Sequence, residues 1–185
     1  MGTLETVTLA TDTAVTVDDA RRQCRLYDDT SFDDLLLRLI TAATEEIEQE
    51  TGMCLVQRTL LLRLDAFPEY EIDLQTYPAQ SITSVKYDDS TNVEVTLANT
   101  EYFLRPGGMV PLLVPKTYWP TTYPKPGAVR ITFIAGYSSV EAVPPDLEQA
   151  ILMRVYDHWN TPGTVDTPVG VSVIKSITNR YRRHI

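Results

Sequence analysis

The residues from Asp28 to Phe67 constrain the fold most, because their pattern changes from helical to strand-like. After candidate N-caps at residues 28–31, apolar residues recur every three or four positions, which predicts an amphipathic helix over residues 31–51. Gly52 is the kind of residue that ends a helix in a left-handed conformation. From Leu55 the pattern becomes that of a strand, and its central leucine run indicates cover on both faces. The apolar helical positions are Phe32, Leu35, Leu36, Leu39, Ile40, Ala43 and Ile47.

Helices are predicted on both sides of a strand-rich middle. Thr16 is a candidate cap for a short helix over residues 17–26, and Pro144 and Pro145 open a helix over residues 145–159. Residues 55–137 alternate between short apolar runs and turn residues, which predicts an antiparallel sheet or small barrel of about six strands. The expected fold class is therefore α+β: N- and C-terminal helices form a small bundle, and an antiparallel β unit is inserted between them.

The two ends of the chain lie outside the predicted domain of residues 17–159. Residues 1–16 are rich in threonine and predict an extended or mobile arm. Residues 160–185 form a breaker-rich loop followed by a C-terminal arm. If the arm is helical, Val173, Ile174, Ile177 and Tyr181 share one face; a strand is the alternative, and helix is preferred.

Charge is distributed unevenly along the 185 residues, which carry a net charge of −9. Residues 1–50 hold twelve acids against four arginines, whereas residues 171–185 hold four basic residues and no acid. The overall charge argues against a general nucleic-acid binder, which needs clustered Lys and Arg. Opposite charge at the two ends instead predicts self-assembly or docking on an acidic partner.

The sequence offers no constellation that supports an enzyme, a metal or a cofactor. The two histidines, His158 and His184, lie apart from the two cysteines, which read as buried thiols. No apolar run is long enough to span a membrane, and the N-terminus lacks the features of a signal peptide. An aromatic loop with Tyr118, Trp119 and Tyr123 is a candidate exposed platform for a sugar or peptide; the alternative is that its rings fold back over the sheet edge.

Four stretches in a fixed order give the chain a recognisable organisation. They are ETGMCLVQRTLLLRLDAFP (Glu50–Pro68), LQTYPAQSITSVKYDD (Leu74–Asp89), YWPTTYPKPGAVRITFIAGY (Tyr118–Tyr137) and VPPDLEQAILMRVYDHW (Val143–Trp159). From about Val17 onward, this order and spacing resemble the head–tail connector, or adaptor, proteins of long-tailed bacteriophages and of gene-transfer particles. The threonine-rich N-terminus does not belong to the recognised pattern.

The resemblance implies a structural virion protein at the head–tail junction, made in the cytoplasm of a bacterial host. It implies a ring, usually of twelve copies, which sits beneath the portal protein, meets head-closure or tail proteins, and extends the channel through which DNA passes without sequence-specific binding. Other readings are a head-closure or tail-completion protein, or a free-standing carbohydrate- or peptide-binding module.

Two sets of site residues follow from this resemblance. The C-terminal segment, Val171–Ile185, is expected to dock on the portal, and the acid face of the long helix is expected to line the channel, where like charge keeps DNA from adhering. The expected docking residues are Val173, Ile174, Lys175, Ile177, Arg180, Tyr181, Arg182 and Arg183. The expected channel-facing residues are Glu45, Glu46, Glu48 and Glu50.

Overall fold

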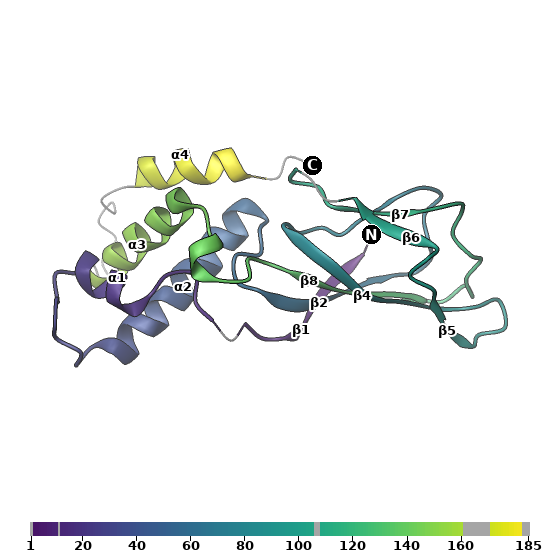
Figure 1. Ribbon diagram of the computed structural model, residues 1–185, viewed down its shortest axis with the longest axis horizontal. Helices are drawn as coiled ribbons and strands as arrows, with labels where there is room; N and C mark the ends of the chain where they lie inside the picture. The colour runs from purple at the N-terminus through teal and green to yellow at the C-terminus, as the bar shows by residue number, and fades with distance from the viewer. Residues whose placement is uncertain (1, 11, 106–107, 161–170, 183–185) are drawn as a thin grey trace. The chain divides into compact units, whose positions relative to one another are not determined.

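The computed structural model describes residues 2–10, 12–105, 108–160 and 171–182 (Figure 1). The chain forms two compact units, each built from segments distant in the sequence. The β unit comprises Met1–Thr11 and Gln57–Gly136, and the helical unit comprises Asp12–Val56 and Tyr137–Ile185. The predicted α+β class, with a β unit inserted between N- and C-terminal helices, is confirmed.

The helical unit packs helices from both ends of the chain around one core. It contains α1 (Val17–Gln23), α2 (Asp33–Thr51), a short 3₁₀ turn at Val140–Ala142, α3 (Pro145–Asn160) and α4 (Val171–Tyr181). Helix α3 lies between α2 and α4 (Figure 1). Its contact with α2 agrees with the prediction that helices from the two ends of the chain form one bundle. The largest fully buried side chains in this core are Leu36, Ile40, Ile47, Leu55, Leu147, Ile151 and Ile174.

The helix ends agree with the sequence prediction at two caps and differ at a third. Thr16 accepts a hydrogen bond from the backbone N–H of Asp19 at 3.1 Å, and Gly52 ends α2 with φ of 75°. Helix α2, however, begins at Asp33 behind Phe32, which makes no side-chain capping bond. The Asp29 carboxylate instead accepts a bond from Ser31 N at 2.9 Å, so the candidate capping residues close a turn before the helix rather than capping it.

The β unit consists of two antiparallel sheets rather than a single sheet of about six strands. The larger has the order β1-β2-β8-β4-β5, and the smaller has the order β3-β7-β6. The strands are β1 (Thr3–Thr8), β2 (Arg58–Leu64), β3 (Ile72–Asp73), β4 (Ala79–Asp88), β5 (Glu94–Leu97), β6 (Tyr102–Arg105), β7 (Leu112–Pro115) and β8 (Val129–Ala135).

The core of the larger sheet lies on one face of its central strands. In β8, Val129, Ile131 and Phe133 are fully buried, and their burial alternates with partly exposed neighbours. In β2, Leu62 is likewise buried, but Leu61 on the opposite face is only partly so. The expected cover on both faces of β2 is therefore incomplete.

The N-terminal segment is a paired edge strand rather than a mobile arm. Strand β1 pairs antiparallel with β2 from Thr3 opposite Arg63 to Thr8 opposite Thr59. An ion pair between Glu5 and Arg63, at 3.2 Å, adds a side-chain contact across these two strands. The pairing partner lies more than fifty residues away along the chain, which explains why local composition did not reveal it.

Candidate functional site

The C-terminal arm is a helix that packs against its own unit, which confirms the preferred reading of this segment. In α4, Ile174 is 0% exposed, and Ile177 and Thr178 are also buried. Of the expected docking residues, Val173, Lys175, Arg180 and Arg182 are exposed, whereas Arg183 lies outside the described residues. The apolar face that was expected to meet a partner therefore stabilises the fold of the subunit itself.

A carboxylate at the start of α3 holds the last turn of α4. The Tyr181 hydroxyl donates a hydrogen bond to Asp146 at 2.8 Å, and the Arg180 guanidinium lies 3.0 Å from the other oxygen of the same carboxylate. Desolvation, followed by the bond to Asp146, raises the pKa of Tyr181 to about 12. Two polar contacts on one carboxylate thus fix the end of α4 relative to α3.

Most of the expected channel-facing glutamates have partners within the helical unit. Glu46 lies 3.0 Å from both Arg154 and His158 on α3, and Glu50 lies 2.7 Å from Arg154. Glu48 accepts a hydrogen bond from Leu55 N at 2.6 Å. These three carboxylates therefore hold α2 against α3 and against the chain that follows Gly52.

The outward face of α2 has a different composition from the predicted acid face. That face carries the exposed side chains of Asp34, Arg38, Thr41, Glu45 and Gln49, and α2 also exposes Leu35, Leu37, Ala42 and Glu50. Among the described residues, Glu45 is the one member of the expected channel-facing set that is exposed and forms no ion pair.

The aromatic loop is anchored by a buried tryptophan. Trp119 is 9% exposed, its indole N–H donates to the Tyr70 carbonyl, and its ring stacks on Phe67 with centroids 4.8 Å apart. Tyr118 is 79% exposed and Tyr123 is 38% exposed. Trp119 is therefore not part of an exposed aromatic platform. It is buried in the β unit, where the Tyr70 carbonyl accepts its N–H.

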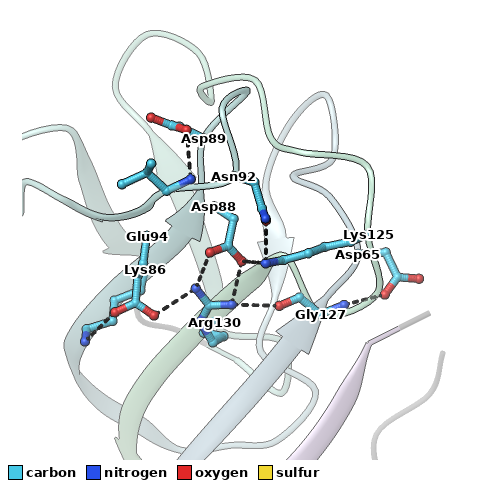
Figure 2. Close-up of polar contacts among 10 residues, drawn as sticks. Asp65, Lys86, Asp88, Asp89, Asn92, Glu94, Lys125, Gly127 and Arg130 are labelled. Carbon is cyan, nitrogen blue, oxygen red and sulfur yellow. Dashed lines mark hydrogen bonds and ion pairs between the residues drawn. The ribbon is translucent and has the colours of Figure 1, made fainter.

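A charged cluster at the end of β4 was not predicted (Figure 2). Asp88 accepts two hydrogen bonds from the Arg130 guanidinium, at 2.8 and 3.1 Å, and lies 3.0 Å from the Lys125 ammonium. Arg130 also donates to Glu94 at 2.9 Å, and Glu94 pairs with Lys86 at 3.1 Å. The bonds from Arg130 above all lower the pKa of Asp88 to about 2.

This cluster joins segments that are distant in sequence. The β4–β5 hairpin contributes Asp88 and Glu94, and the segment before β8 contributes Lys125, which also donates to Asn92 at 2.8 Å. The sequence signal that could have indicated the cluster is Arg130, a charged residue within the largely apolar strand β8. The members of the cluster are paired with one another, and these contacts tie the β4–β5 hairpin to β8.

In the described part of the chain, no group of three or more His, Cys, Asp and Glu side chains is arranged to hold a metal ion. No helix among the described residues is long and apolar enough to cross a membrane. Cys24 and Cys54 are free and buried, and burial raises the pKa of the Cys24 thiol.

Comparison with known proteins finds similarity to one family and to chains from one kind of particle. Residues 14–101 match the family described as phage gp6-like head-tail connector protein. A chain from the neck of an empty GTA particle, computed with C6 symmetry, is similar with a TM-score of 0.87 and 25% identity, over 99% of this chain and 96% of that chain. No curated protein matches the sequence.

Two further solved structures have the same fold. A chain from the virion of the native gene transfer agent (GTA) particle is similar with a TM-score of 0.81 and 27% identity, over 98% of this chain and 96% of that chain. A chain from the neck of the native GTA particle, computed with C12 symmetry, has a TM-score of 0.76 and 24% identity, over 99% of this chain and 96% of that chain. The likeness thus covers both units.

Proposed function

We infer the function of this chain from its similarity to the phage gp6-like head-tail connector family, whose model matches residues 14–101, and from the fold that it shares with a chain of a GTA neck. The chain is a structural protein of the virion, located where the head joins the tail. The observation that carries this conclusion is the match to a neck protein over 99% of this chain, because it includes both units and both ends of the described structure.

We propose in addition that copies of the chain form a ring around the DNA channel. Two related chains come from necks computed with C6 and with C12 symmetry, and a ring of twelve is compatible with both. A closed ring requires each copy to present two different surfaces, one to each neighbour. A channel that DNA traverses also favours a protein of negative charge, as the net charge of −9 provides.

We propose that the outward face of α2 lines the channel. Arg154 forms ion pairs with both Glu46 and Glu50, and Glu48 accepts a hydrogen bond from Leu55 N, so Glu45 is the acid of the expected set that can face DNA without an ion-pair partner among the described residues. Glu45→Lys is expected to leave particle assembly intact and to slow DNA release, which fluorescence of a DNA-binding dye measures. Release at the normal rate would exclude Glu45 from the channel wall.

We propose that the C-terminal segment, Val171–Ile185, contacts the portal protein, with head-closure or tail proteins at the opposite end of the ring. Support comes from the four basic residues, with no acid among them, in residues 171–185 of a chain whose overall charge is negative. The free-standing sugar- or peptide-binding module is less well supported, because Trp119 is buried and hydrogen-bonded instead of exposed.

Deletion of the gene tests the structural role. Without the protein, the expected products are DNA-filled heads and separate tails, and supplying the protein from a plasmid restores joined particles. Negative-stain electron microscopy distinguishes these outcomes. Complete tailed particles that form without the protein would contradict a connector role.

A further inference from the structure

The outward side of α4 (Val171–Tyr181) and the residue that follows it carry three exposed polar side chains, here called the stripe. Lys175 and Asn179 are four positions apart on the helix, and Arg182 comes directly after its last residue, three positions beyond Asn179, so the three continue one helical face. The two cations are seven positions apart, which corresponds to roughly 10 Å along a helix axis. Helix α4 contains no acidic residue that could offset this charge.

The opposite side of α4 is already occupied by the subunit's own core. Ile174 is completely buried, Ile177 is 7% exposed, and Tyr181 is bound to Asp146. A partner that used this face would have to displace α4 from α3. That displacement would expose two buried isoleucine side chains to water, which is unfavourable.

The basic side chains of α4 differ in whether they have partners. Arg180 is paired with Asp146 at 3.0 Å, and this pair belongs to the attachment of the helix. Within the part of the chain that the structure describes, Lys175 and Arg182 form no ion pair. A second molecule could therefore bind these two charges without breaking an ion pair among the described residues.

We propose that the Lys175–Asn179–Arg182 stripe is the docking face of α4 and that it binds a carboxylate-rich protein surface. This inference rests on the proposed function, in which the partner of the C-terminal segment is the portal protein, and it specifies the chemistry of that contact. Two cations with an amide between them suit carboxylates spaced two helical turns apart. Charge complementarity fixes how the two surfaces align. Repetition of the contact around a ring raises the overall affinity well above that of a single copy.

A nucleic acid is the less favoured partner for the same stripe. Phosphate binding depends on many clustered cations, whereas this chain offers two here and has a net charge of −9. A second copy of this chain is another possible partner, because the outward face of α2 exposes Asp34 and Glu45. Both alternatives are outcomes of the experiment below.

The test compares two double charge reversals that have the same net charge. Lys175→Glu with Arg182→Glu changes the stripe, and Arg25→Glu with Lys116→Glu changes two exposed cations elsewhere; each pair shifts the net charge from −9 to −13. Binding of the full-length protein to purified portal rings is measured by surface plasmon resonance at low and high salt. Circular dichroism checks that the variants, whose changes are all at exposed positions, keep the native helix content.

We expect the stripe variant to bind portal rings at least about 10-fold more weakly than the wild type, and the control to stay within about 2-fold, since two exposed pairs become repulsive. The wild-type affinity should fall as salt rises. The neutral pair Lys175→Gln with Arg182→Gln should give an intermediate loss.

Three results would overturn the inference. Wild-type affinity in the stripe variant would show that the portal is bound elsewhere, while leaving the connector role intact. If the wild-type protein does not bind portal rings and the stripe variant loses self-association, the partner is a second copy of this chain. If the stripe variant instead loses binding to a duplex DNA probe, the partner is a nucleic acid. Failure of the connector role itself would appear separately, as complete particles in the gene deletion.

Discussion

Truncation of Ile174 tests whether the apolar face of α4 forms part of the subunit's own core. Ile174 is 0% exposed, whereas its neighbour Val173 is 49% exposed on the other side of the helix. Truncation of a fully buried isoleucine to alanine costs about 2–5 kcal/mol, because it removes apolar burial and leaves a cavity. Truncation at an exposed position changes stability by about 0.5 kcal/mol or less.

The expected difference between Ile174→Ala and Val173→Ala is therefore at least about 1.5 kcal/mol in the free energy of unfolding. Guanidinium titration followed by far-ultraviolet circular dichroism measures it, because helix content reports on the helical unit. Equal stability of the two variants would refute the reasoning. It would mean that Ile174 does not contribute to the core, and that the apolar face of α4 is free to meet a partner after all.

Three further predictions concern individual contacts. Tyr181→Phe removes the bond to Asp146 and should destabilise the helical unit by about 1 kcal/mol in thermal unfolding. The pKa of Tyr181 is raised from 10.0 to about 12, so this contribution should be complete below about pH 10 and lost as pH rises to about 12; an unchanged alkaline transition in Tyr181→Phe would contradict it. Trp119→Phe keeps an aromatic ring but leaves the Tyr70 carbonyl without its hydrogen-bond donor. The free energy of unfolding, measured in urea, should fall by about 1–3 kcal/mol. Wild-type stability would show that the carbonyl accepts a hydrogen bond from another donor. The pKa of Asp88 is lowered from 3.8 to about 2, so its stabilising effect should be full above about pH 4 and disappear toward pH 2; Asp88→Asn should remove that part of the acid transition, and an identical transition would refute the role of the cluster.

Local sequence patterns were sufficient where the structure is determined by nearby residues. The periodicity of α2 and the glycine at its end predicted the helix and its C-terminal stop, and Gly52 has the expected left-handed conformation. The three-to-four-residue spacing in the C-terminal arm favoured a helix, and α4 is one. These features depend on residues within a few positions of each other, so the sequence contains the whole signal.

Other features depend on partners that are distant in the chain, and these escaped prediction. Glu46 and Glu50 appeared to be a solvated acid face because Arg154, which binds both, lies on α3. An exposed platform was one reading of Trp119, and the carbonyl that it binds belongs to Tyr70. An acidic or apolar stripe is visible in a sequence, but whether it faces solvent or another segment is decided by tertiary packing.

The position of the chain in the particle is the central claim, and a cryo-electron microscopy reconstruction of purified particles tests it most directly. The account predicts that both units of this chain fit density in a closed ring between the portal and the tail, with α4 on the portal side. A neck that contains no density for this fold, or a particle in which the chain occupies another site, would contradict the account.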